Sequence, residues 1–280
     1  MFRSCPRRMF FFFKPDRKVK PMQKFIEYIL SFQPDFLEKV EGATPEEIES
    51  LERTIGFPLP QQYKEFLLLM GKNTGSFSFG AEEETANINE IIEFYEEIKE
   101  DGETISEDYV VVVLGFLDRL CILNEDADGE SKVMILDGNK IVGYEAQSLE
   151  NMLLKMAFTL YKLPSFPHYR TYSDASREKR LPLAEEIVNF FDFKTLWFSD
   201  ATEICAQKDN AAISISQTQF EGMTVGGVVV YVAANSKEEA KRIGDVFERE
   251  LKTKLVNVDD KLYRNIGQPS IITIQKGRMS

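Results

Sequence analysis

The side chains that most often carry out chemistry in proteins are few in this sequence. His168 is the single histidine among 280 residues, so sites that need several imidazoles, such as zinc hydrolase centres, are excluded. A cysteine or serine nucleophile could reach His168 only through tertiary folding, so we interpret it as a loop residue. The run Asp126-Ala127-Asp128-Gly129 begins like a calcium loop, but the later ligands that such a loop requires are absent. We interpret this run as a solvated hairpin turn.

Cysteine and glycine patterns add no catalytic or cofactor site. Cys5, Cys121 and Cys205 fall in three separate segments without a CxxC pair, which argues against a disulfide framework and a zinc site and favours a reducing, cytoplasmic compartment. The pair Gly226-Gly227 lacks the third glycine and the following helix of a dinucleotide loop. We therefore predict a protein that is not an enzyme and that uses no metal or cofactor. The less favoured alternative is an enzyme in the C-terminal half.

Carboxylates are the one reactive group that the sequence concentrates. The net charge is −12, and it divides into +7 over residues 1–24, −19 over residues 25–165 and zero over residues 166–280. A field of this sign repels nucleic acid and anionic lipid and accelerates encounter with a basic partner. The longest apolar run, Tyr109 to Leu117, is too short to span a bilayer. We predict a protein partner, and neither nucleic acid nor a membrane.

One predicted helix positions many of these carboxylates. Apolar residues recur at helical spacing from Ile88 to Ile98 and predict an inward-facing side. The acidic side chains of the opposite side are Glu90, Glu93, Glu96, Glu97 and Glu100. Such a side is either a solvated surface or a docking surface for a basic protein, and we favour docking. Further residues expected at this surface are the acids Asp126 and Asp128 and the apolar anchors Phe77, Phe79 and Tyr95.

Two short helices are predicted before the acidic helix. Thr44-Pro45-Glu46-Glu47 is a capping box with proline at the first helical position. Gly56 is placed to end this helix in a left-handed cap. Leu59-Pro60 opens the second helix, and Gly71 ends it. We expect a short, rigid link between the two helices.

The segment that holds these two helices resembles the opening signature of the SUKH superfamily, which includes the fungal cell-wall-synthesis regulator and many bacterial immunity proteins. The residues that carry the resemblance are Glu46, Glu47, Ile48, Leu51, Glu52, Ile55, Gly56, Leu59, Pro60, Tyr63, Phe66, Leu67, Asn73 and Gly75. The sequence departs from the signature at the end of the second helix, where Gly71-Lys72 precede the Asn-Gly pair and Thr74 divides it. The resemblance covers roughly residues 22–163 and implies a sheet packed by helices and a protein-binding module.

The order of predicted elements gives an α+β fold in two domains. Residues 1–21 are a basic tail, which the start of translation at Met9 or Met22 would omit in whole or in part. Residues 22–163 form the SUKH-like domain, with strands at 109–117, 119–123, 132–136 and 140–144 in an antiparallel meander and a last helix after Ser148. Residues 164–182 contain three prolines and are predicted to be a linker. Residues 183–280 form a second α+β domain of unrecognised type, with a helix over 184–193, strands at 195–198, 212–216 and 225–234, a helix after Ser236, and strands at 254–258 and 270–274.

These features predict a non-enzymatic, cytoplasmic protein-binding module. Since the resemblance implies an immunity protein and the charge favours a basic partner, we interpret the chain as an immunity protein that neutralises a basic, nuclease-like bacterial toxin. A nuclease must be basic to bind phosphate, and carboxylates copy the charge of its substrate. The alternative is a regulatory scaffold of the cell-wall-synthesis regulator type.

Overall fold

The computed structural model describes residues 22–79, 84–103, 106–115, 119–123, 131–138, 140–220 and 225–259. Three sequence predictions lie outside these residues: the basic tail 1–21, the turn with Asp126 and Asp128, and the strand at 270–274. Helices and antiparallel strands make up the described part, so the predicted α+β class is confirmed.

A group of helices opens the fold. They are α1 (Gln23–Leu30), α2 (Phe36–Lys39), α3 (Pro45–Ile55) and α4 (Gln61–Met70). The predicted capping box is present: the Thr44 hydroxyl accepts a hydrogen bond from the Glu47 N–H at 3.3 Å, and the Glu47 carboxylate accepts one from the Thr44 N–H at 2.8 Å. Gly56 ends α3 with φ of 93°, a left-handed conformation that glycine adopts without strain. The start and the end of α3 are therefore set by local sequence.

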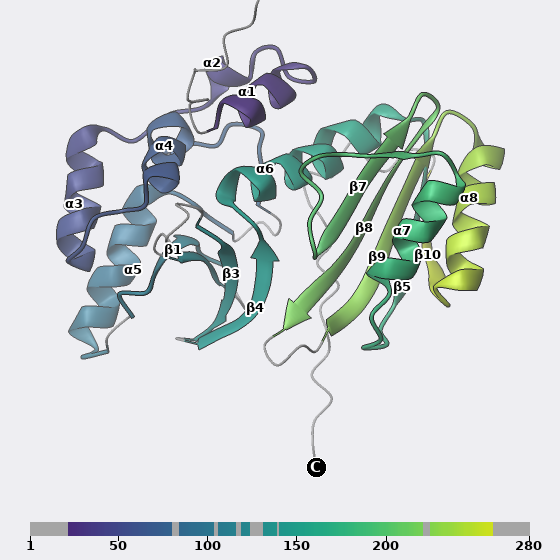
Figure 1. Ribbon diagram of the computed structural model, residues 1–280. Coiled ribbons are helices and arrows are strands. Elements are labelled where there is room, and N and C mark those ends of the chain that lie inside the picture. Colours follow the sequence, from purple (N-terminus) through teal and green to yellow (C-terminus); the bar gives the residue numbers. More distant parts are fainter. Residues whose placement is uncertain are drawn as a thin grey trace, which may run out of the picture.

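The predicted meander follows, between two further helices. Its elements are α5 (Ile88–Glu100), β1 (Tyr109–Val113), β2 (Arg119–Leu123), β3 (Val133–Asp137), β4 (Lys140–Ala146) and α6 (Leu149–Ala157), which continues into a π-helical turn at Phe158–Lys162 and a 3₁₀ turn at Leu163–Ser165. Each strand pairs antiparallel with the next. All five residues of β1 are buried, and β1 contacts helix α5, which lies beside it (Figure 1).

The C-terminal half adds six strands and two helices. They are β5 (His168–Asp174), α7 (Leu181–Phe190), β6 (Lys194–Thr195), β7 (Glu203–Lys208), β8 (Ala211–Phe220), β9 (Val225–Ala234), α8 (Lys237–Glu250) and β10 (Lys254–Asp259). Helices α7 and α8 lie on one face of these strands (Figure 1). Their apolar sides form a second core with that face, to which α8 contributes Ala240, Ile243 and Phe247. Strand β7 was not predicted, and the strand predicted at 195–198 is only the two-residue β6.

The segment predicted as a linker contains a strand of the sheet. Strand β5 pairs along its whole length with β9 on one side and with β10 on the other. Its side chains alternate as a two-sided strand requires, and Tyr172, on the side of α8, is fully buried. The polar composition of β5 hid this role. Pro167 precedes the strand and Pro182 follows it, so residues 168–174 contain no proline and can pair on both edges.

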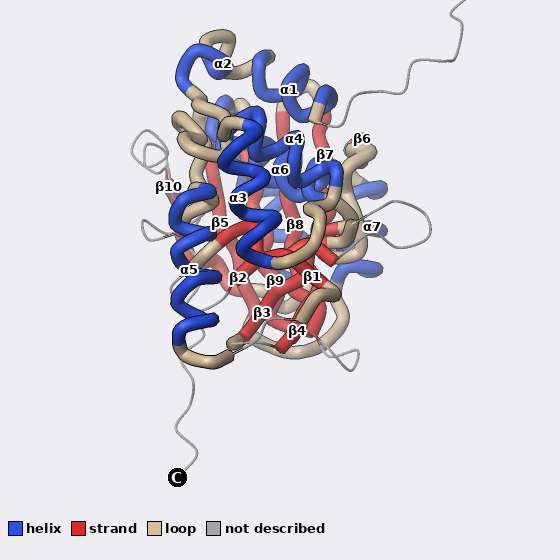
Figure 2. Tube along the Cα trace, turned by 90° about the vertical axis from the view of Figure 1, so that its left-hand side faces the viewer, coloured by secondary structure: helices blue, strands red, loops and turns tan. Residues whose placement is uncertain are grey.

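One sheet runs through both halves of the chain. Its strand order is β1-β2-β3-β4-β8-β9-β5-β10, and the halves join where β4 pairs with the end of β8 at Gly143–Phe220 and Tyr144–Gln219. Strand β7 pairs with the earlier part of β8, residues 211–216. Since β9 occupies the other edge of β8, β4 and β7 share one edge and the sheet forks there. Figure 2 shows the helices α1 to α6 stacked over this forked sheet.

The first core crosses this junction. It is built mainly from residues 22–163, but Phe198, Cys205, Ala212 and Ala233 of the C-terminal half belong to it as well. Phe198 packs edge-on against Tyr28 of α1, with ring centroids 5.5 Å apart. The two halves are therefore in close apolar contact.

Candidate protein-interaction surface

Helix α5 is held firmly from its inner side. The Asn87 side chain caps it by accepting a hydrogen bond from the Asn89 N–H at 2.9 Å, and its amide group donates to the Lys72 carbonyl at 2.9 Å. The Tyr95 hydroxyl accepts a hydrogen bond from the Val111 N–H at 2.9 Å and so ties α5 to β1. Burial raises the pKa of this hydroxyl, which keeps it neutral.

The outer side of α5 carries the predicted carboxylates, all of them exposed. We call this set the acidic face: Glu90, Glu93, Glu96, Glu97 and Glu100. Within the described part of the chain no ion pair involves any of the five. Lys99, the one basic residue of the helix, donates to the Thr54 carbonyl of α3. The charge of the acidic face is therefore not neutralised locally.

The neighbouring helix α3 packs against α5 (Figure 1) and is also acidic. Its Glu46 and Glu49 are exposed. Glu47 is different, because it pairs with Lys72 at 3.0 Å. The backbone N–H of Thr44 and this ion pair lower the pKa of Glu47. The two helices together present an outer layer in which exposed carboxylates outnumber exposed cations.

The proposed apolar anchors do not lie on this surface. Phe77 and Phe79 are 2% and 8% exposed, and Tyr95 is 4% exposed. The ring of Phe77 contacts those of Phe25 and Phe79 edge-on, at centroid distances of 5.4 and 5.6 Å. These three side chains fill the core under the helices, where aromatic rings gain most from burial, so we leave them out of the interaction surface. Asp126 and Asp128 lie outside the described residues.

The residues of the family signature have structural roles. A Glu52 oxygen accepts hydrogen bonds from the Leu59 N–H and the Lys64 ammonium, at 2.8 and 2.7 Å. Burial opposes its ionisation, but these two donors outweigh that effect and lower the pKa of Glu52. The carboxylate thus fixes the short link between α3 and α4. Leu59, Pro60, Tyr63 and Phe66 are buried.

The departure from the signature forms a defined loop. Asn73 bridges to Glu41, and the Asn73 side chain accepts a hydrogen bond from the Gly75 N–H at 2.8 Å. Gly75 has φ of 64°, which favours glycine. A Cβ on Gly71 would lie 2.7 Å from the Leu67 carbonyl oxygen, so only glycine fits there. The inserted residues are therefore compatible with the fold.

A buried charged cluster that was not predicted from the sequence lies at the fork of the sheet. The Lys155 side chain is 2% exposed and that of Asp200 is 4% exposed. The Lys155 ammonium donates to the Asp200 carboxylate at 3.1 and 3.2 Å, to the Thr202 hydroxyl at 2.9 Å and to the Glu145 carbonyl at 2.8 Å. The cluster therefore joins α6 and β4 to the loop before β7.

The electrostatics of this cluster suit a structural role. Burial alone would lower the pKa of Lys155, but the carboxylates of Glu203, Glu145 and Asp200 outweigh burial and raise it. Burial raises the pKa of Glu145; Lys155 opposes this shift, whereas Glu203 and Asp200 add to it. All the donors of Lys155 have partners, so it is not free to act as a base. Among the described residues no group of three or more His, Cys, Asp or Glu side chains could hold a metal ion.

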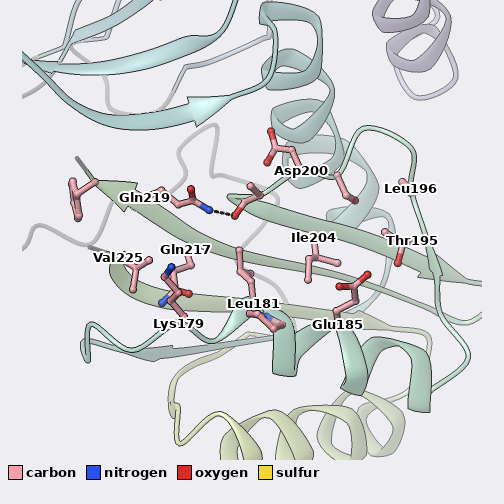
Figure 3. A pocket seen from close by; sticks show the side chains of 14 residues that line it. Lys179, Leu181, Glu185, Thr195, Leu196, Asp200, Ile204, Gln217, Gln219 and Val225 are labelled. Atoms are coloured by element: carbon pink, nitrogen blue, oxygen red, sulfur yellow. Dashed lines mark hydrogen bonds between the residues drawn. The ribbon is translucent and has the colours of Figure 1, made fainter. Parts of the chain in front are cut away.

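A cavity of about 570 Å³ lies beside this cluster, under the start of α7. Figure 3 shows Leu181, Ile204 and Val225 along its apolar wall, and Gln219 donating a hydrogen bond to the Ala201 carbonyl at 2.6 Å. The amide of its buried Gln217 is fully engaged with backbone groups. Among the described residues that line the cavity, no buried polar group is left without a hydrogen-bond partner and available to a ligand.

Comparison with known proteins identifies a family for part of the chain. The model of the SMI1 / KNR4 family (SUKH-1) matches residues 42–155, which include α3, α4, the acidic face and the meander. The predicted resemblance is confirmed for this segment, and no other segment has a family match. No curated protein and no solved structure matches the chain significantly. The family points to a protein-interaction or immunity module and is generally non-enzymatic. None of the helices in the described ranges has the length and hydropathy needed to cross a bilayer.

Proposed function

We propose that this protein is a cytoplasmic immunity protein that binds and neutralises a basic, nuclease-like protein toxin. The observation that carries the proposal is the acidic face, which lies on a SUKH-like segment with five exposed carboxylates and no ion-pair partner among the described residues. A surface of this kind matches the charge of the phosphate backbone that a nuclease binds. The domain would act by occupying the active site of the toxin.

The physical advantage of such a surface is the rate of association. Exposed like charges on one rigid helix produce a field that steers an oppositely charged partner, and such steering can raise association rates by about 10- to 1,000-fold at low ionic strength. The rigid anchoring of α5 through Tyr95 and Asn87 fixes the backbone that carries the carboxylates. Little backbone entropy is then lost on binding.

The test begins with co-purification of the full chain from its native cell and identification of the bound protein. A salt titration of the complex follows. Because the Debye length shortens from about 10 Å at 0.1 M salt to about 3 Å at 1 M, the association rate should fall steeply over this range. An acidic partner, or a rate that does not change with salt, would contradict the proposal.

A pair of charge-reversal variants locates the contact. Replacing Glu93 and Glu97 by lysine should slow association by about tenfold or more at low salt. The matched control replaces Glu186 of α7 and Glu248 of α8, which are exposed and carry the same charge change on the other half. If both variants slow association equally, only net charge matters and the acidic face is not the contact.

The second candidate is a regulatory scaffold, which the SMI1 / KNR4 description of the matching family favours. A scaffold would bind its partner without blocking an active site. Assaying the nuclease or other activity of the co-purified partner, with and without this protein, distinguishes the two functions. Unchanged partner activity in a stable complex would favour the scaffold.

A further inference from the structure

Strand β10 forms one end of the ten-stranded sheet. It pairs with β5 along one edge, from Lys254–Ser173 to Asp259–Tyr169. No described residue pairs with its other edge. Since every strand pair in this sheet is antiparallel, the edge offers backbone donors and acceptors to a further antiparallel strand.

Three side chains of this edge strand are apolar and exposed. Leu255, Val256 and Val258 are 40%, 57% and 44% exposed. They are three of only seven large hydrophobic residues that are exposed in the described part of the chain. Edge strands of soluble proteins are usually protected by charge, proline or a bulge. Here a bulge lies between Leu255 and Asn257 and leaves Val256 without a partner on β5, but the middle of the strand carries no charge and no proline.

We propose that this edge pairs with the β10 edge of a second copy of the chain, which gives a symmetric dimer with one continuous sheet. A two-fold axis through Asn257 makes the two strands antiparallel and places Val256 of each copy opposite Val258 of the other. Pairs of β-branched residues of this kind stabilise antiparallel strands.

The charge distribution favours a second copy over a strongly basic partner. Two chains of net charge −12 repel each other, but residues 166–280, which include β10, are neutral overall. A strongly basic partner would gain nothing from this edge. Figure 1 places β10 at the opposite end of the sheet from α3 and α5, so the dimer keeps the acidic faces far apart and leaves both open. The dimer does not depend on the proposed function, since it uses a different surface.

Sedimentation equilibrium of the full chain over a range of concentrations tests this dimer. The expected mass at high concentration is twice the 32.2 kDa of one chain. Lysine at an edge strand blocks pairing, so Val256→Lys and Val258→Lys should each weaken dimerisation by about tenfold or more. Both side chains are exposed, and unchanged circular dichroism and thermal unfolding will show that the variants fold.

Leu68→Lys on α4 is the matched control, because Leu68 is 51% exposed and lies on another element. It should leave the dimer intact. A monomer at all concentrations would overturn the proposal. Evidence that residues 260–280 of the same chain, or another protein, occupy the edge would overturn it too. A dimer that resists both valine substitutions, or that Leu68→Lys weakens equally, would overturn it as well.

Discussion

Replacing Lys155 by methionine tests whether the buried charged cluster holds the two halves of the sheet together. Methionine has a similar length and volume but no charge and no donors. The variant leaves the Asp200 carboxylate, 4% exposed, without its cation. It also removes the ammonium donor from the Thr202 hydroxyl and from the Glu145 carbonyl, which keeps its hydrogen bond from the Thr202 hydroxyl at 2.8 Å.

The magnitude follows from the cost of an unpaired buried charge. Removing one partner of a buried ion pair costs about 3–5 kcal/mol. Three backbone N–H groups near Asp200, including those of Thr202 and Glu203 at 2.9 and 3.2 Å, still solvate the carboxylate, so we expect about 3 kcal/mol. The double variant Lys155→Met, Asp200→Asn removes both charges. It should therefore recover at least about 1 kcal/mol relative to the single variant.

Urea denaturation gives the free energy of unfolding for each variant. Trp197, the single tryptophan, contacts Phe198 with ring centroids 5.6 Å apart, so its fluorescence reports on the junction directly. Circular dichroism reports on the whole chain. The control is Lys241→Met, which removes an exposed ion pair with Asp245 on α8 and should change stability by about 0.5 kcal/mol or less.

The pH dependence gives this prediction a second readout. Burial, together with Asp200 and Glu203, raises the pKa of Glu145 in the wild type, while Lys155 opposes that shift. Without the lysine, this pKa should rise further. A carboxyl whose pKa is raised on folding destabilises the native state most above that pKa, and the loss shrinks as pH falls through it. The destabilisation should therefore be smaller at acidic pH than at neutral pH. A loss below about 1 kcal/mol at neutral pH, or a double variant no more stable than Lys155→Met alone, would refute a stabilising role for the ion pair.

Three further predictions concern local structure. Thr44→Ala removes the cap of α3 and should cost about 1 kcal/mol in urea denaturation, whereas Thr44→Ser should restore most of the loss; equal losses in both variants would show that the cap hydroxyl is not the cause. Hydrogen bonds from Arg242, the largest cause, and from Lys208 lower the pKa of Glu239 to about 2 from its ordinary 4.5. The ionised Glu239 therefore stabilises the fold fully above pH ~4.5, and this contribution is lost as pH falls toward 2. The Glu239→Gln variant cannot take up this proton, so its stability should fall less than that of the wild type between pH ~4.5 and 2. An unchanged acid transition would contradict this role of Glu239. Gly244→Ala gains up to about 1 kcal/mol in helix propensity, but its Cβ would lie 1.9 Å from the Tyr172 hydroxyl oxygen. Overpacking should therefore prevail and lower stability by about 2 kcal/mol or more. A stabilised variant would show that the Tyr172 ring moves aside freely.

Local signals in the sequence were sufficient for much of the N-terminal half. The Thr44 capping box, the Gly56 end of α3 and the meander strands all depend on residues within a few positions of each other. The outward side of α5 could also be predicted, because its apolar period leaves the carboxylates on the other side. Its role in binding stays a prediction.

The errors came from contacts between residues distant in sequence. Strand β5 is polar, and only its ladders with β9 and β10 make it a strand of the sheet interior. Phe77 and Phe79 were expected as apolar anchors at the surface, but both rings are buried in the first core. Lys155 had a local signal: it is the only basic residue of α6, whose other residues at positions 152–154 are all buried. Nothing local shows that its partner is Asp200, 45 residues away.

The buried cluster also bears on how the SUKH-like segment functions in this chain. The family match ends at residue 155, and Lys155 pairs with Asp200 beyond that end. The sheet also continues from β4 into β8, and Phe198 enters the first core. A flexible tether would let the acidic face move independently of the C-terminal half. These three connections instead fix the orientation of the acidic face relative to β10, so a dimer formed through β10 would hold two acidic faces at a constant separation.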